Sequence, residues 1–221
     1  MTGKIPLIIL LLVSISLIVF AKSVYVDADT DCFYVPQKVS NSDKLVPALL
    51  YLSCTGAVKN DLDSLKFIGD SLGWILFSCH KTRNHRDPMQ NDLDIMKTYN
   101  KAIKKYPIDT TKVFAYGFSG QGVQALQEMF MHPTKFKGVH SVCAHTGAMS
   151  FAKWSTLNGH IAYLISREKD WNLNENILID QSFLYHGVRD TLVVTPGEHG
   201  IGDKYEIWQA IKWLKTNSQQ K

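Results

Sequence analysis

The 221-residue sequence contains no internal repeat and no low-complexity tract, and its 45% hydrophobic and 20% charged residues describe an ordinary globular chain. Its net charge is only +4, and the Lys and Arg residues form no stripe with interleaved aromatic residues, so nucleic acid is not an expected partner. Cysteine is scarce, and the spacings of the four cysteines match no zinc pattern. The sequence therefore predicts neither a metal site nor a cofactor.

The four cysteines are Cys32, Cys54, Cys79 and Cys143. In an oxidising compartment they permit disulfides, with three possible sets of pairs. Cys54 and Cys79 each close an apolar run, and the two runs are expected to form neighbouring strands, so this pair is the favoured disulfide. The alternative is that the cysteines are buried free thiols, because cysteine is commonly a core residue.

The longest apolar stretch covers residues 5–20, after Lys4 and before Ala21. A positive start, an apolar middle and small residues ahead of a cleavage point are typical of an export signal, so we predict a signal peptide over residues 1–21. The alternative is an uncleaved N-terminal anchor, although a helix over residues 5–21 would span only about 25 Å. Either interpretation predicts an exported protein, secreted or periplasmic, with membrane contact only through this segment if it is uncleaved.

Residues 22–221 are enough for one well-buried core and too few for two domains of ordinary size, so a single domain is predicted. Short apolar runs cover residues 46–52, 74–78, 113–116, 139–143, 161–165 and 192–194. These runs are too apolar to alternate between a buried and an exposed face, as expected for strands covered on both sides. They predict an α/β domain with a mostly parallel sheet of about six to seven strands.

Segments of helical spacing separate these runs. Their apolar positions are Leu62, Leu65, Ile68 and Leu72; Leu93, Met96 and Ile103, with a polar break at Asn100; Val123, Leu126 and Phe130; and Ile207, Trp208, Ile211 and Leu214. Strands and helices in alternation predict helices on both faces of the sheet.

Residues 117–122, Gly-Phe-Ser-Gly-Gln-Gly, directly follow one apolar run and precede a helical segment. A buried strand that ends in such a turn is the setting for a nucleophilic serine, here Ser119. Ligands of a parallel sheet bind beyond the carboxyl ends of its strands, and a serine hydroxyl needs a base to remove its proton. His199 follows the last run at the same edge, which makes it the candidate base.

Two aspartates compete to orient His199. Asp170 follows the run 161–165 and is expected at the functional edge, whereas Asp190 precedes the run 192–194 and is expected at the opposite end. We therefore predict Ser119, Asp170 and His199 as a catalytic triad, with Asp190 as a turn residue. The alternative role for Asp170 is the N-cap of a helix ahead of Leu173.

An ester carbonyl attacked by Ser119 would develop negative charge on its oxygen, which backbone N–H groups must meet. Gly120 is expected to supply one of these donors. The second is expected from the loop after the run 46–52, through Cys54 or Thr55.

With these residues in place, the chain from about residue 46 to residue 214 resembles a small member of the α/β-hydrolase superfamily, similar to secreted esterases of the carboxylesterase and polyhydroxybutyrate-depolymerase-like type. The order Ser, Asp, His is that of the superfamily. The chain departs from the family pattern at Gln121, where glycine is usual, and at residues 53–56, Ser-Cys-Thr-Gly, where relatives carry His-Gly. A side chain at Gln121 should either shift the following helix or leave the serine turn less strained.

The resemblance also implies where a lid would be inserted, after the sixth strand, but residues 144–160 leave room only for a short connection. No lid domain is expected, and an open cleft suits a bulky, polymeric or surface-displayed ester. His145, Trp154, Trp171 and Arg86 are candidate substrate contacts. The predicted function is an exported carboxylic-ester hydrolase that uses an acyl-enzyme intermediate. The alternatives are a serine peptidase on the same fold and a catalytically inactive binding domain, which Gln121 and the missing His-Gly favour.

Overall fold

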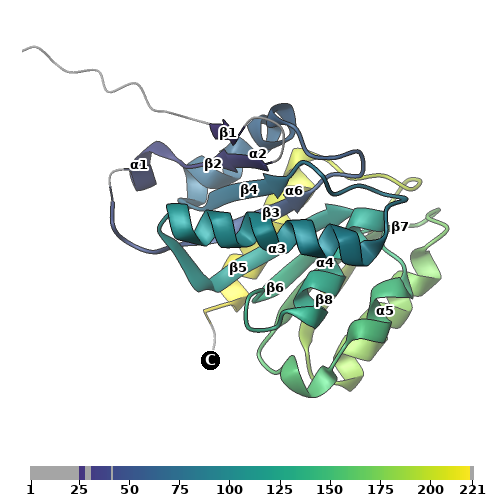
Figure 1. Ribbon diagram of the computed structural model, residues 1–221. Coiled ribbons are helices and arrows are strands. Elements are labelled where there is room, and N and C mark those ends of the chain that lie inside the picture. The colour runs from purple at the N-terminus through teal and green to yellow at the C-terminus, as the bar shows by residue number, and fades with distance from the viewer. Residues whose placement is uncertain (1–24, 28–30, 41, 220–221) are drawn as a thin grey trace, which may run out of the picture.

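The computed structural model describes residues 25–27, 31–40 and 42–219. The strands are β1 (Tyr25–Asp27), β2 (Asp31–Tyr34), β3 (Val46–Leu52), β4 (Ile75–Cys79), β5 (Ile108–Phe118), β6 (Gly138–Val142), β7 (Ile161–Arg167) and β8 (Arg189–Thr195). The helices are α1 (Gln37–Ser40), α2 (Lys59–Leu72), α3 (Pro88–Lys105), α4 (Gly120–Met131), α5 (Leu173–Tyr185) and α6 (Lys204–Asn217). Figure 1 shows how strands and helices alternate from β3 onward, as the sequence predicts.

The described strands form one eight-stranded sheet, in the order β1-β2-β4-β3-β5-β6-β7-β8. Every neighbouring pair from β4 to β8 is parallel, and the six predicted runs coincide with β3 to β8. The sheet exceeds the predicted six to seven strands because β1 and β2 add an antiparallel edge next to β4. These two strands are three and four residues long and include aspartates, so they form no recognisable apolar run.

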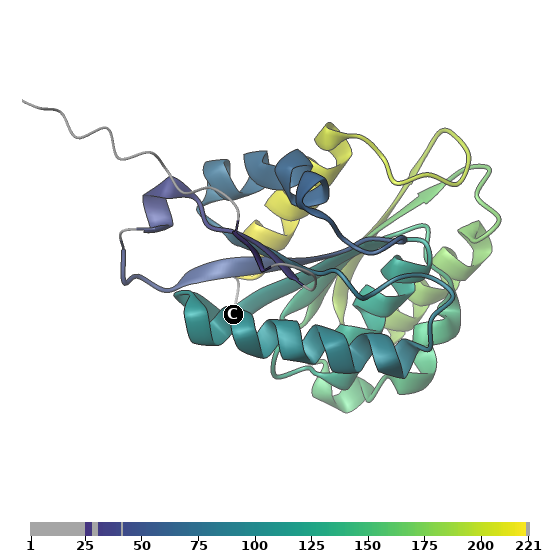
Figure 2. The same cartoon turned by 45° about the horizontal axis from the view of Figure 1, so that its top comes forward.

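Both faces of the parallel sheet are covered by helices. In β3, Ala48, Leu50 and Leu52 pack with side chains of α3, α4 and α5, whereas Leu49 and Tyr51 pack with side chains of α2 and α6. Figure 2 shows the two helix layers on opposite sides of the sheet. Because successive side chains of a strand point to opposite faces, two buried faces require strands that are apolar throughout.

The predicted helix around residue 96 is present as α3. Of its predicted apolar positions, Met96 and Ile103 are partly buried against the core, whereas Leu93 is 50% exposed. The fully buried residues also include apolar Ile95, Tyr99 and Ala102 and polar Asn91, Asp92, Asp94 and Thr98. Several of these polar side chains bond neighbouring segments, so the apolar pattern alone missed part of the buried face.

The predicted disulfide is wrong, because all four cysteines are free thiols. Strands β3 and β4 are neighbours, but Leu50 pairs with Phe77, so Cys54 lies beyond the level of Cys79, the last residue of β4. The Cys54 thiol donates instead to the Phe118 carbonyl oxygen at 3.1 Å. The alternative of free thiols is confirmed.

The predicted signal peptide, residues 1–21, lies outside the described residues and stays a prediction. Among the residues that the structure describes, no helix combines the length and the apolar character needed to cross a membrane. The connection after β6 contains two short 3-10 helices, η1 (Thr146–Phe151) and η2 (Trp154–Thr156), and no inserted domain, as expected.

Candidate active site

Ser119 lies in a tight turn between β5 and α4. Its backbone has φ of 56° and ψ of −128°, a conformation of the kind that costs a non-glycine residue about 1–3 kcal/mol. Two glycines permit the turn. A Cβ on Gly117 would lie 2.1 Å from the Gln121 carbonyl oxygen, and one on Gly122 would lie 3.0 Å from the Ser141 hydroxyl. The turn therefore places Ser119 at the carboxyl edge of the sheet, as predicted.

Gln121 does not relax this turn, because Ser119 keeps its positive φ. The Gln121 side chain is buried, and its Nε2 donates to Asn84 Oδ1 at 3.4 Å. Its Oε1 has no hydrogen-bond partner among the described residues. The close contact between helix and strand uses Gly122, one position later, so the departure from the usual glycine is accommodated without loss of the strained serine.

Three side chains from separate loops form a hydrogen-bonded row. His199 Nε2 lies 3.0 Å from Ser119 Oγ, and His199 Nδ1 lies 2.9 Å from Asp170 Oδ1. Ser119 follows β5, Asp170 follows β7 and His199 follows β8. The carboxyl ends of three parallel strands thus bring together the three residues predicted from their order along the chain.

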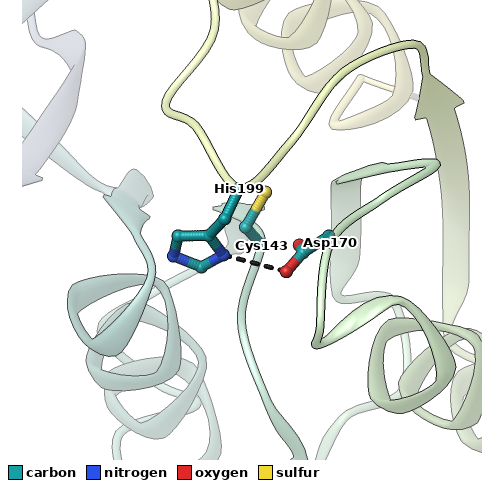
Figure 3. A group of neighbouring side chains, drawn as sticks. All are labelled: Cys143, Asp170 and His199. Carbon is teal, nitrogen blue, oxygen red and sulfur yellow. Dashed lines mark hydrogen bonds and ion pairs between the residues drawn. The ribbon is translucent and has the colours of Figure 1, made fainter.

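The Asp170 carboxylate is buried but well supplied with donors. Burial opposes its charge, yet the neighbouring Cys143 thiol and hydrogen bonds from the Asn172 N–H and His199 outweigh this effect and lower the pKa of Asp170. Figure 3 shows Cys143 beside the Asp170–His199 pair. Asp170 therefore remains ionised at neutral pH and can stabilise a protonated imidazole. Its alternative role is not observed, since the N-cap of α5 is Asn172.

Asp190 lies at the opposite end of the sheet from His199. It pairs with Ala162 near the start of β7, whereas Asp170 comes after β7 has ended. The geometric reason for rejecting Asp190 as the acid is therefore correct. The prediction that Asp190 is a turn residue is wrong, because β8 begins at Arg189, ahead of its apolar run.

Two aromatic rings enclose the His199 imidazole. The Trp171 ring stacks on it with centroids 3.9 Å apart and an interplanar angle of 18°, and the Phe118 ring lies at 4.8 Å. Trp171 is nevertheless 74% exposed, so its other face is open to solvent. The two rings restrict the imidazole to the plane in which it reaches both Ser119 and Asp170.

The loop that carries His199 is held by Arg167, which the sequence analysis did not identify. The buried Arg167 guanidinium pairs with Glu206 at 2.5 and 2.9 Å, and its Nε donates to the Gly200 carbonyl oxygen at 3.4 Å. The sequence did contain one indication of this role, an arginine at the end of an otherwise apolar strand. A charge buried at such a position needs an oppositely charged partner. Arg167 acts as a positioning residue for the imidazole.

The predicted oxyanion donors differ in their surroundings. The backbone N–H groups of Gly120, Cys54 and Thr55 donate to no acceptor among the described residues. Gly120 lines the cleft beside Ser119, whereas Cys54 and Thr55 do not. The Asn84 side chain lies against Gly120, with Oδ1 only 2.6 Å from the place of a Cβ there. Asn84 thus borders the position where an oxyanion would form.

A cleft of about 340 Å³ opens beside Ser119. The predicted contacts Arg86, His145 and Trp171 line it, but Trp154 does not. Trp154 packs against Phe130 and Phe183 and stacks on His186, so it belongs to the core under α5. Side chains of the loop after β4 and of α4 build much of the cleft wall, and of that loop only Arg86 was predicted as a substrate contact.

Two groups of side chains in the described part of the chain are close enough to hold a metal ion, Cys143–Asp170–His199 and Asp92–Glu128–His132. In the first group, burial raises the pKa of Cys143 to about 12, so the thiol keeps its proton. In the second, burial raises the pKa of Glu128 well above its ordinary value, and His132 Nε2 lies 2.6 Å from Asp92 Oδ1. His132 and Asp92 are thus joined by a hydrogen bond, whereas Glu128 Oε2 has no hydrogen-bond partner among the described residues.

No family model and no curated protein matches the sequence. Solved structures do match. A ferulic acid esterase superposes with a TM-score of 0.67 at 16% identity, over 85% of this chain and 92% of that chain. A structure described as a thermostable esterase gives 0.69 at 17% identity, over 87% of this chain and 61% of that chain.

Porphyromonas gingivalis dipeptidyl peptidase 4 also matches, with a TM-score of 0.64 at 13% identity. The match covers 85% of this chain, which spans 33% of the peptidase chain. Identities this low establish the architecture alone. Together with the sheet order and the serine turn, they show that the chain has the α/β-hydrolase fold without a lid domain.

Proposed function

We propose that this protein is a serine hydrolase that cleaves carboxylic esters through an acyl-enzyme intermediate. The observation that carries the proposal is the pair of hydrogen bonds from His199, one to Ser119 Oγ and one to Asp170. The strained serine turn supports it, because strain at a residue of this kind is concentrated at functional sites. Structures of the same fold that are named esterases support it further.

In the acylation step, Ser119 Oγ attacks the ester carbonyl carbon while His199 Nε2 takes the hydroxyl proton. The Gly120 N–H and the N–H of Cys54 or Thr55 donate to the oxyanion of the tetrahedral intermediate. The intermediate collapses when the bond to the alcohol oxygen breaks and His199 returns its proton to that oxygen. The alcohol leaves, and the acyl group stays on Ser119.

In the deacylation step, a water molecule gives a proton to His199 Nε2 and attacks the acyl carbon. The bond to Ser119 Oγ then breaks, and His199 protonates the serine. One ester and one water have become one acid and one alcohol. In both steps the ionised Asp170 stabilises the transient imidazolium.

A fluorophosphonate probe tests the nucleophile directly, because it reacts with an activated serine. We expect the wild-type protein to be labelled, with the label on Ser119 in a peptide map, and Ser119→Ala to be unlabelled at the same circular dichroism and Tm. Folded wild-type protein that resists labelling would instead identify a binding domain on the hydrolase scaffold.

Ester and amide hydrolysis use the same triad, and a dipeptidyl peptidase shares the fold. A panel of 4-nitrophenyl esters and short peptide 4-nitroanilides separates the two activities. We expect kcat/KM for the esters to exceed that for the anilides. Turnover of anilides above esters would assign the site to a peptidase.

A further inference from the structure

The cleft beside Ser119 is basic and rich in amide groups. The described residues that line it include two arginines, two histidines and no Asp or Glu. Six of them carry a side-chain amide: Asn84, Asn91, Gln121, Gln124, Gln127 and Asn172. All of these but Asn84 are buried, and their amide nitrogens already donate to protein groups. Pro88, Val123 and Trp171 are apolar residues of the lining. A lining with two arginines and no carboxylate fits a substrate that carries negative charge.

The two arginines of the cleft differ in their partners. Arg86 is paired with Asp94, whose Oδ2 accepts from Nη2 at 2.6 Å, and it also donates to Asn91 Oδ1 at 3.1 Å. Arg83 is exposed, and its guanidinium makes no hydrogen bond or ion pair with a described residue. The Arg83 charge is therefore available to a ligand. A guanidinium is permanently charged and binds a carboxylate through two parallel hydrogen bonds.

The acidic residue nearest in sequence does not neutralise Arg83. The Asp87 carboxylate caps α3, where it accepts hydrogen bonds from the N–H groups of Met89 and Gln90 at 2.7 and 3.2 Å. It does not line the cleft. The loop from Arg83 to Arg86 thus presents an unpaired cation on the cleft side and a helix cap behind it.

The backbone of this loop is strained at His85, where φ is 58°. The non-glycine residues with positive φ among the described residues are His85, Ser119 and Cys143, and all three lie at the candidate active site. Such strain persists where the surrounding structure enforces it, and it concentrates at ligand-binding positions. His85 and Arg83 both line the cleft.

We infer that the ester cleaved at Ser119 carries an anionic group, a carboxylate or a group of like charge and shape, which pairs with the Arg83 guanidinium. This inference rests on the proposed hydrolase function.

Matched pairs of esters test the inference on the purified full chain. One pair carries the charge on the acyl side, mono-4-nitrophenyl adipate against its neutral terminal carboxamide. The other carries it on the alcohol side, 4-carboxyphenyl acetate against 4-carbamoylphenyl acetate. We expect kcat/KM for the anionic member to exceed that for the neutral member by about fivefold to tenfold in one pair, and the ratio to fall as salt rises. The pair that responds shows on which side of the ester the anion lies.

Arg83→Gln should bring that ratio close to one, whereas Lys81→Gln should leave it unchanged. Lys81 is an exposed cation in the same loop that does not line the cleft, so it controls for a general loss of positive charge. Ratios near or below one in the wild type for both pairs would overturn the inference while leaving the hydrolase intact. Equal losses in the two variants would also overturn it. If no ester is cleaved and Ser119 resists the fluorophosphonate, the proposed function fails and the inference fails with it.

Discussion

Asp170 follows strand β7 and Asp190 lies in the neighbouring strand β8, and their surroundings shift their pKa values in opposite directions. The Asp170 carboxylate accepts from Asn172 and His199 and lies beside the Cys143 thiol, and these contacts lower its pKa despite burial. Asp190 is also withdrawn from water, and burial together with the nearby Asp180 raises its pKa to about 7. One carboxyl group is held as an anion at neutral pH, and the other keeps its proton into the neutral range.

The difference follows from which end of the strand each residue occupies. Beyond the carboxyl end of β7, loops turn their N–H groups and side-chain donors toward Asp170. At the amino end of β8, Asp190 faces a second carboxyl group, Asp180 on α5, and its Oδ2 has no partner among the described residues. The same residue type is therefore suited to stabilise an imidazolium at one edge of the sheet and not at the other.

Replacement of each carboxyl group by an amide tests most directly whether the two aspartates have different roles. Asp170→Asn should lower kcat by about a thousandfold to ten-thousandfold, because the amide favours the wrong imidazole tautomer and removes the charge that stabilises the imidazolium. Asp190→Asn should leave kcat within about twofold of wild type. The measurement is steady-state hydrolysis of 4-nitrophenyl acetate by both variants at pH 8. Similar losses in the two would mean that position along the strand does not decide the role.

A smaller effect on catalysis is expected from substitution of Trp171, which lies next to Asp170 in the sequence and far from Asp190. Trp171→Ala removes the ring that stacks on His199, an interaction of about 0.5–1.5 kcal/mol, so kcat/KM should fall about twofold to tenfold. Trp171→Phe keeps a ring there and should recover most of the loss. Because Trp171 is largely exposed, Tm should change little in either variant. A loss confined to KM would show that the ring binds substrate and does not restrain the imidazole.

The sheet was largely predictable because strands buried on both faces appear in the sequence as short apolar runs. Strands β3 to β8 each contain a short apolar run, and the turn at Gly117 and Gly122 has a steric cause that the sequence displays directly. The edge strands β1 and β2 are only three and four residues long, so the apolar pattern did not identify them. The buried face of α3 was predicted only in part, since its contacts include Asn91 and Asp94, which bond Arg86.

The three residues of the hydrogen-bonded row were predictable from chain order, because parallel strands carry whatever follows them to one edge. The contacts that support this row were not predictable. They are the hydrogen bond of Arg167 to the His199 loop, the stacking of Trp171 on His199, and the contact of Asn84 with Gly120. Such contacts join side chains from different loops, and residue spacing in the sequence does not indicate them. The prediction of a Cys54–Cys79 disulfide was wrong for a similar reason. The sequence indicated that the two strands are neighbours but not which of their residues lie opposite each other.

The smallest expected effect is a change in protein stability with pH that depends on Asp190. Between about pH 4 and pH 7 the unfolded chain has lost the Asp190 proton and the folded protein keeps it, so the free energy of unfolding falls as pH rises through this window. Asp190→Asn removes the titrating group. If solvent screening leaves about 1 kcal/mol of this effect, the Tm of the variant relative to wild type should rise by ~2–4 °C from pH 4.5 to pH 8. Thermal melts of both proteins across this range measure the difference. A Tm difference that stays constant with pH would show that Asp190 ionises normally and that the two aspartates differ only in their distance from His199.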